Sequence, residues 1–109
     1  MERDKHITPV IFRKTKERGY PVEITAVFPA EPGGDGTRLD QMTCYVYVGQ
    51  HGTCDLGWYI QTKAAKPAEY AELLAELESI GYNLRVYRKM TRKHVAERRA
   101  EIKRLRDLV

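Results

Sequence analysis

The stretch "KPAEYAELLAELESIG", Lys66 to Gly81, decides the fold because it is the clearest helix in the chain. Pro67 suits the first helical position, where its missing N–H costs nothing, and Gly81 suits a left-handed stop. Glu69 and Glu72 favour the positive N-terminal end of the helix. Apolar residues recur at intervals of three and four and form one stripe, made of Tyr70, Leu73, Leu74, Leu77 and Ile80. We expect this stripe to pack on a sheet.

Four segments around this helix are expected to be strands. The first is rich in β-branched and aromatic residues, and the other three place alternate residues on two faces. The four segments are "PVIFRK" (9–14), "PVEITAVF" (21–28), "MTCYVYV" (42–48) and "YNLRVYRK" (82–89). The first two form a hairpin around Gly19, and residues 29–41 are expected to be a long exposed loop. In the fourth, the pattern predicts Leu84 and Val86 facing inward and Tyr87 facing outward.

A second helix is expected from the N-cap Thr91 to the end of the chain, since no Gly or Pro interrupts "TRKHVAERRAEIKRLRDLV". Its apolar positions form a thin seam of Val95, Ile102, Leu105 and Val109, so we expect it to be weakly held, docked or projecting, with a homodimer through this helix as one outcome. The predicted class is α+β, in the order β-β-β-α-β-α: an antiparallel sheet with one helix packed on it and a basic C-terminal helix. Residues 1–90 form a single domain and residues 91–109 the basic helix.

The bulk composition suits a small hydrated domain. The chain has 109 residues, of which 31% are charged, and a mean hydropathy of -0.56. No stretch approaches the roughly 20 apolar residues that crossing a bilayer requires, and "MERDKHITP" lacks the apolar core of a secretory signal. Only two cysteines are present, which predicts free thiols rather than a disulfide scaffold. We therefore expect a cytoplasmic protein without a membrane contact and without a cofactor.

Charge is distributed unevenly along the chain. Residues 1–84 carry nine Lys or Arg against twelve Asp or Glu, a net charge of -3. Residues 85–109 carry ten against three, a net charge of +7. An acidic body with a basic C-terminal element indicates a polyanionic partner, either nucleic acid or an acidic protein surface, although a solvated helix without a partner is also compatible with it.

Lys and Arg gain affinity for nucleic acid by counterion release, and an outward tyrosine among them adds base stacking. No helix-turn-helix, zinc-finger or RNP pattern accompanies them. The predicted nucleic-acid or partner-binding residues are Arg85, Tyr87, Arg88, Lys89, Arg92, Lys93, Arg98, Arg99, Lys103 and Arg106, with Arg104 among the same cations.

The segment "VGQHGTCDLGWY", residues 48–59, is dense in chemically active groups. Cys44, His51 and Cys54 are candidate zinc ligands, and Cys54 with His51 as base and Asp55 as orienting acid is a candidate nucleophile. Neither set is complete, because paired zinc-ribbon spacing and known nucleophile signatures are both missing. The favoured interpretation is structural: Gly49, Gly52 and Gly57 allow a tight strand-to-helix turn.

The string "CYVYVGQHGTCDLGWYIQTKAAKPAEYAELLAELESIGYNLRVYRK", which begins at Cys44, resembles a family of small uncharacterised proteins of bacterial genomes, phages and mobile elements. "VGQHG", the "EYAELLAELESIGY" helix and the basic strand after it carry the resemblance, and "VIFRK" and "ITAVFP" fit the same pattern. It covers most of Val10 to Lys89. It implies a phage or mobile-element origin and no assigned activity.

A weaker resemblance is to HicB-type antitoxin domains, through the proline-rich turn "FPAEPGG". A third strand rather than a helix is expected after "GDGT", which departs from that pattern. Part of the double-stranded-RNA-binding-domain topology is also compatible with the element order, but function does not transfer from a fold.

These observations predict a small non-enzymatic binding protein that contacts nucleic acid or a nucleic-acid-handling protein through its basic C-terminal helix. The alternative is an inhibitor of a host enzyme or defence protein that acts by protein–protein contact. The third hypothesis is a Cys/His enzyme or metal site within residues 44–55.

Overall fold

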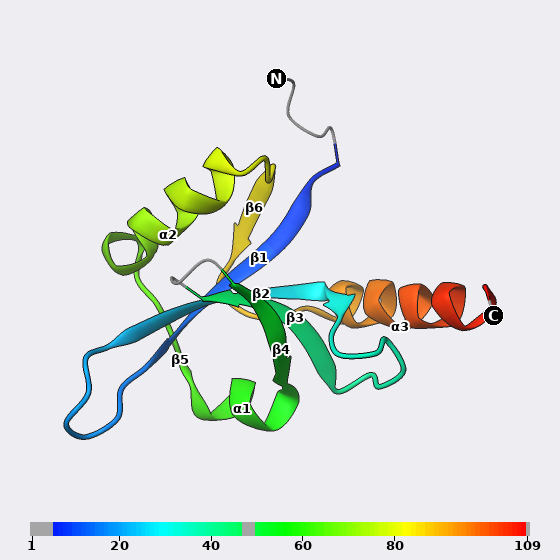
Figure 1. Ribbon diagram of the computed structural model, residues 1–109, viewed down its shortest axis with the longest axis horizontal. Coiled ribbons are helices and arrows are strands. Elements are labelled where there is room, and N and C mark those ends of the chain that lie inside the picture. The colour runs from blue at the N-terminus through cyan, green and yellow to red at the C-terminus, as the bar shows by residue number, and fades with distance from the viewer. Residues whose placement is uncertain (1–5, 47–49, 109) are drawn as a thin grey trace.

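A computed structural model describes residues 6–46 and 50–108 of the chain. Three helices accompany one six-stranded sheet in this part of the chain (Figure 1). The strands are β1 (Thr8–Thr15), β2 (Glu23–Pro32), β3 (Gln41–Val46), β4 (Gln50–Asp55), β5 (Lys63–Ala64) and β6 (Leu84–Tyr87). The helices are α1 (Leu56–Gln61), α2 (Pro67–Ser79) and α3 (Arg92–Arg106). The predicted α+β class is confirmed.

The sheet is built on β1 and β2. Its order is β4-β3-β2-β1-β5, and β6 also pairs with β1. Every pair is antiparallel except β1 with β6, which run parallel in the register Thr8↔Leu84 to Ile11↔Tyr87. A parallel neighbour requires a crossover connection, and α2 lies within the segment that returns the chain to β1. The predicted antiparallel sheet therefore gains one parallel strand at this edge.

The two faces of the sheet bury separate apolar clusters. One face carries Val10, Phe12, Ala26, Phe28 and Tyr45 under Leu73 and Leu77 of α2. The other carries Ile11, Val27, Met42, Cys44 and Cys54, with Tyr59 of α1 and the partly buried Trp58, Tyr87 and Met90. The predicted stripe of α2 is confirmed except at Ile80, which is 53% exposed. Helices therefore cover both faces of the sheet.

Two predicted chain reversals have the backbone that only glycine adopts easily. Gly19 has a φ of 85° in the β1–β2 connection, and Gly81 has a φ of 111° just after α2. The Tyr82 N–H donates to the Leu77 carbonyl at 3.1 Å, so the end of α2 is tied back onto its last turn.

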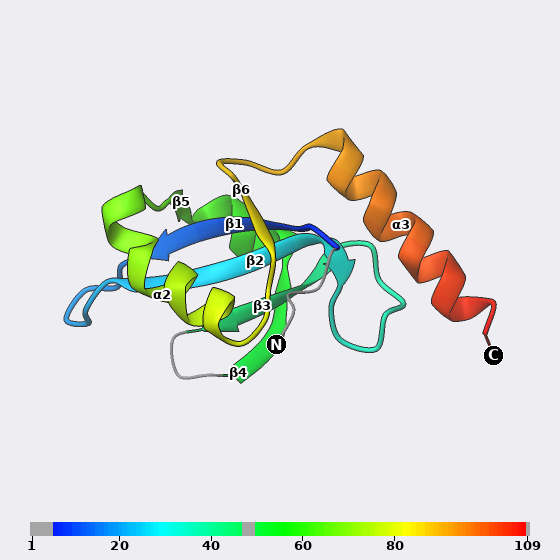
Figure 2. The ribbon, with the colours of Figure 1, turned by 90° about the horizontal axis from the view of Figure 1, so that it is seen from above.

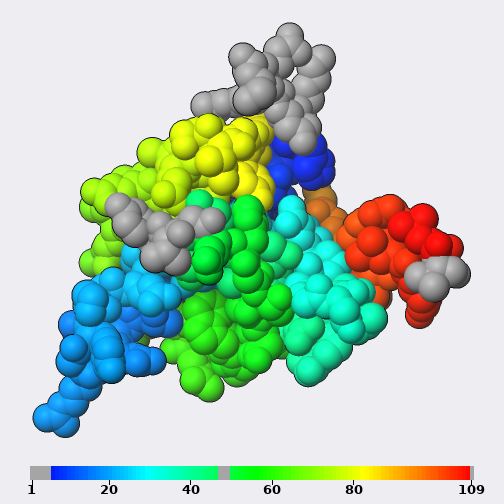
Figure 3. Space-filling model, viewed as in Figure 1, coloured from blue at the N-terminus to red at the C-terminus, as the bar shows by residue number. Residues whose placement is uncertain are grey.

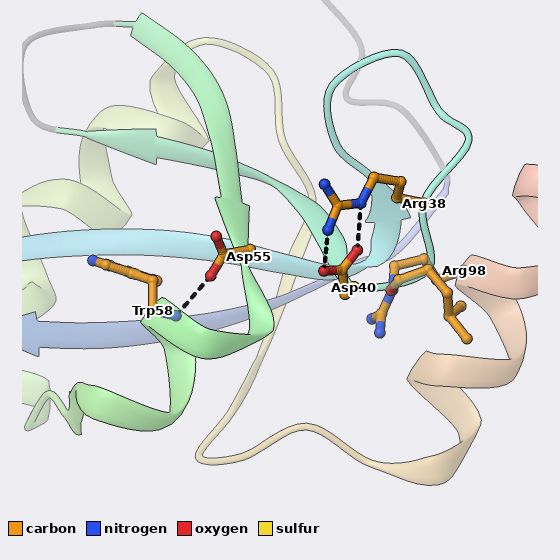
Figure 4. A network of polar contacts seen from close by, with 6 residues as sticks. Arg38, Asp40, Asp55, Trp58 and Arg98 are labelled. Atoms are coloured by element: carbon orange, nitrogen blue, oxygen red, sulfur yellow. Dashed lines mark hydrogen bonds and ion pairs between the residues drawn. The ribbon is translucent and has the colours of Figure 1, made fainter.

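The segment predicted to be a tight turn is instead a strand followed by a short helix. β4 pairs with β3 along its whole length, from Gln41↔Asp55 to Val46↔Gln50. Asp55 then caps α1, because its carboxylate accepts from the Trp58 N–H at 2.7 Å (Figure 4). Gly52 and Gly57 are not among the glycines with positive φ, so neither makes a left-handed turn. Tyr47, Val48 and Gly49 lie outside the described residues.

The predicted loop at residues 29–41 is shorter than expected. β2 continues through Pro32, and only residues 33–40 separate it from β3. This loop is bonded to β4 and to the start of α1, since the Gly34 N–H donates to Thr53 Oγ1 at 2.7 Å and the Leu56 N–H donates to the Asp40 carbonyl at 2.8 Å.

The last helix, α3, is docked at its N-terminal half and extends away from the sheet at its C-terminal half (Figures 2 and 3). His94 and Arg98 are each 2% exposed, whereas Leu108, just beyond the helix, is 70% exposed. None of the helices among the described residues has the length and apolar content needed to span a bilayer.

Candidate nucleic-acid interface

The first turn of α3 is fixed by a reciprocal cap. The Thr91 hydroxyl accepts from the His94 N–H at 3.2 Å, and His94 Nδ1 accepts from the Thr91 N–H at 3.1 Å. A histidine thus takes the role that Glu or Gln usually has in a capping box. Burial lowers the pKa of His94 below 6.5, which favours the neutral ring that this bond requires. The predicted N-cap is confirmed.

Arg98 fastens α3 to the body of the protein. Its Nε donates to the Leu39 carbonyl at 2.8 Å, and its Nη1 donates to the Pro29 carbonyl and contacts Met90 Sδ at 3.6 Å. Figure 4 shows the side chain reaching from α3 toward the loop that carries Asp40. Burial lowers the pKa of Arg98 from its ordinary value, but an arginine in a protein stays protonated at neutral pH. The prediction of Arg98 as a partner-binding residue was wrong, because two backbone carbonyls occupy its donors.

Tyr87 faces inward rather than outward. Its ring meets the His94 ring edge-to-face at 4.4 Å and packs with the cluster that contains Ile11 and Met42. The reason is the parallel register, which places Tyr87 opposite Ile11 on the face that α3 covers. Arg85 lies over this ring at 5.4 Å. Tyr87 therefore supports the docking of α3, and the expectation that its side chain faces outward was wrong, although the ring is only partly buried.

The other cations of the C-terminal segment are exposed and form what we call the basic strip. Figure 2 shows the chain leading from β6 to α3, which lies at one end of the molecule. The basic strip consists of Arg85, Arg88, Lys89, Arg92, Lys93, Arg99, Lys103, Arg104 and Arg106.

Within the basic strip, Arg92, Arg99 and Lys103 form a row on one side of α3. Arg99 and Lys103 are seven and eleven residues after Arg92, close to two and three full helical turns, so the three side chains leave the helix in nearly the same direction. At a rise of 1.5 Å per residue the row is about 17 Å long. No ion pair within the described part of the chain involves any of the three. The row is therefore available to an external anion.

Three other cations of the strip lie beside carboxylates of the same helix or its cap. Lys93 is 3.9 Å from Glu97, Arg106 is 3.9 Å from Asp107, and Arg104 is paired with Glu101. Such exposed pairs are worth little and are readily exchanged for another anion. The strip thus offers six cations without an ion pair and three with a weak one, counted over residues 85–106 as described.

His51 and the two cysteines lie on opposite faces of the sheet. His51 Nε2 is 2.7 Å from the Tyr82 hydroxyl, and its ring meets the edge of Tyr45 at 4.9 Å. Cys44 and Cys54 are buried free thiols in the other cluster. The neighbouring Cys44 thiol and burial raise the pKa of Cys54, so it is held protonated.

This separation removes the geometry that a Cys44, His51 and Cys54 metal site, or a Cys54–His51 pair, would need. Within the described residues, no group of three His, Cys, Asp or Glu side chains is placed to hold a metal ion. What the sequence missed is the partner of His51: Tyr82, which is 31 residues away, brings the α2–β6 turn onto β4.

Comparisons with protein-family models, curated proteins and solved structures found no significant match to this chain. The resemblance to a family of phage and mobile-element proteins therefore stays a prediction.

Proposed function

We propose that this protein binds nucleic acid through the basic strip. The observation that supports the proposal is the row of Arg92, Arg99 and Lys103, which is exposed and without ion pairs in the described structure. A phosphate backbone supplies closely spaced negative charges, and each phosphate neutralised by a cation releases counterions. Arg98 anchors the helix that carries this row to β2 and the loop after it, so less conformational entropy is lost on binding.

Charge reversal of the row tests the proposal without removing α3. The variant Arg92→Glu, Arg99→Glu, Lys103→Glu is expected to lower the affinity for a single-stranded oligonucleotide and to reduce the salt slope of log K by about 2, at 0.7 per phosphate. The matched control is Lys16→Glu, Arg18→Glu, Lys63→Glu, which changes net charge equally at exposed positions outside the strip. Fluorescence anisotropy at several salt concentrations measures both. An equal loss of oligonucleotide affinity in the two variants would contradict the proposal, and so would the absence of binding by the unmodified protein at low salt.

The alternative, an inhibitor that acts by protein–protein contact, is favoured by a different surface. A cavity of about 550 Å³ lies between the tip of the β1–β2 hairpin and α2, where Tyr20 is 67% exposed and Val22 is 44% exposed. Exposed aromatic and aliphatic side chains of this kind are typical of protein interfaces. A stoichiometric protein partner that survives nuclease treatment and is lost on Tyr20→Ala would favour this function over nucleic-acid binding.

A further inference from the structure

A cavity lies beside the basic strip, at the edge of β1 where pairing passes from β6 to β5. β6 pairs with the first half of β1 as far as Ile11↔Tyr87, and β5 takes over the same edge at Arg13↔Ala64. Phe12 lies between these two pairings, and its carbonyl accepts from the Ala65 N–H at 3.0 Å. The cavity between β5, β6 and the start of α2 has a volume of about 430 Å³.

The walls of this cavity are apolar and aromatic. Phe12 is 2% exposed and stacks on Tyr70 of α2, with ring centroids 4.3 Å apart and planes 9° from parallel. Val86 lies opposite Val10 in the register, on the same face as Phe12, and is 37% exposed. The volume is within the range of about 300–1,000 Å³ of small-molecule sites. A nucleobase, which has apolar faces and polar edges, is compatible with this volume and this lining.

The charge around the cavity points to an anionic occupant. Lys66 and Arg88 are both in its lining and both exposed, and neither makes an ion pair among the described residues. The four other cavities described in the structure each include at least one glutamate, whereas this lining has no carboxylate. Arg88 is also the member of the basic strip from which the chain continues through Lys89 to α3.

We propose that this cavity holds one unpaired base of a single-stranded nucleic acid, whose flanking phosphates contact Lys66 and Arg88 and whose backbone continues along the basic strip. The inference rests on the proposed function and specifies its substrate class. A base in this position contacts the Tyr70 ring and the Val86 side chain. A base within a duplex is paired and stacked and cannot enter, so the cavity selects single strands.

The test compares two oligonucleotides with the same number of phosphates, one with bases and one abasic throughout, in DNA and RNA versions. The unmodified protein is expected to bind the base-containing strand about tenfold more tightly, in the range that loss of one stacked base causes. The variant Val86→Trp fills the cavity from an exposed position, and we expect it to bind both strands with the affinity of the abasic one. Val22→Trp, at an exposed valine of the hairpin, is the matched control and should keep the tenfold preference.

The outcomes separate this inference from the proposed function. Equal, salt-dependent binding of both oligonucleotides by the unmodified protein would overturn the base site and leave the basic strip intact. Absence of binding to either would overturn both. A measurement without any variant guards against misfolding: the Val86 methyl resonances should shift on addition of the base-containing strand and not of the abasic strand, and shifts confined to α3 would contradict the base site.

Discussion

Arg98 and Arg99 are neighbouring residues of the same type, but we expect them to contribute differently to the free energy of unfolding. Arg98 is 2% exposed and donates to carbonyls of Leu39 and Pro29, whereas Arg99 is exposed. Arg98→Met keeps the aliphatic stem but leaves both carbonyls without their donor, so we expect a loss of about 3 kcal/mol in the free energy of unfolding. Arg99→Met should change it by less than about 0.5 kcal/mol. Urea unfolding followed by circular dichroism measures both, and equal effects would show that Arg98 is not the anchor of α3.

His94 makes the stability of the protein depend on pH. Its pKa is lowered from 6.5 by burial, so the unfolded chain binds the proton more readily than the folded protein does. The contribution of His94 is therefore fully present above about pH 6.5 and is lost as pH falls from there toward the lowered pKa. We expect the urea midpoint to fall between pH 7.5 and pH 5.5 for this reason.

His94→Gln is the control for the pH effect, because a glutamine can still accept a hydrogen bond from the Thr91 N–H but does not titrate.

Glu31 changes stability with pH in the opposite direction to His94. Burial raises the pKa of Glu31, so its protonation stabilises the folded protein as pH falls from that raised value toward 4.5. Since Glu31 is present in both proteins, its effect cancels in the comparison. A His94→Gln variant with the same fall in midpoint as the unmodified protein would disprove the role of His94.

Among the strands, the β2–β3 connection tolerates no side chain at its first residue. A Cβ on Gly33 would lie 2.5 Å from the Met42 carbonyl oxygen and 2.7 Å from Thr53 Cγ2, which belong to β3 and β4. Gly33→Ala should therefore lower the free energy of unfolding by about 2 kcal/mol, through displacement of the strand backbone.

Gly52 in β4 is the matched control, since a Cβ there meets Cys44 Sγ at an ordinary 3.7 Å. Gly52→Ala should leave stability unchanged or raise it by up to about 1 kcal/mol, because alanine restricts the unfolded chain more than glycine does. Thermal unfolding of the two variants measures the contrast. A Gly52→Ala variant as unstable as Gly33→Ala would argue against the structural interpretation of these positions.

For the molecule as a whole, α3 and the sheet should unfold together. The cluster under α3 contains Met90 and Tyr87, and Arg98 bonds to Pro29 of β2 and to Leu39 of the following loop. The sheet therefore loses part of its cover when α3 leaves. We expect helical circular dichroism at 222 nm and the fluorescence of Trp58, the single tryptophan, to give coincident urea transitions. Loss of helical signal before the Trp58 transition would instead support an autonomous 1–90 domain.

Much of the fold was predictable because its local signals are strong. The limits of α2 and the N-cap of α3 are confirmed, and β1, β2 and β3 overlap the segments predicted to be strands. β4 and α1 were missed, because "QHGTCD" has little apolar alternation and its order comes from pairing with β3. The C-terminal segment was correctly predicted to be helical. Its anchoring side chains were not, since Val95 and Ile102 are only partly buried while His94 and Arg98 are buried.

The sequence by itself determined the periodic elements and the concentration of positive charge in the last 25 residues, because periodicity, caps and charge depend on residues close together in the chain. Only the tertiary structure decided which cations face solvent, that β6 runs parallel to β1, and that His51 is separated from the two cysteines. These features depend on partners far along the chain, such as Pro29, which is 69 residues from Arg98. Burial and hydrogen-bond satisfaction are properties of the assembled fold, so no local pattern could distinguish Arg98 from Arg99.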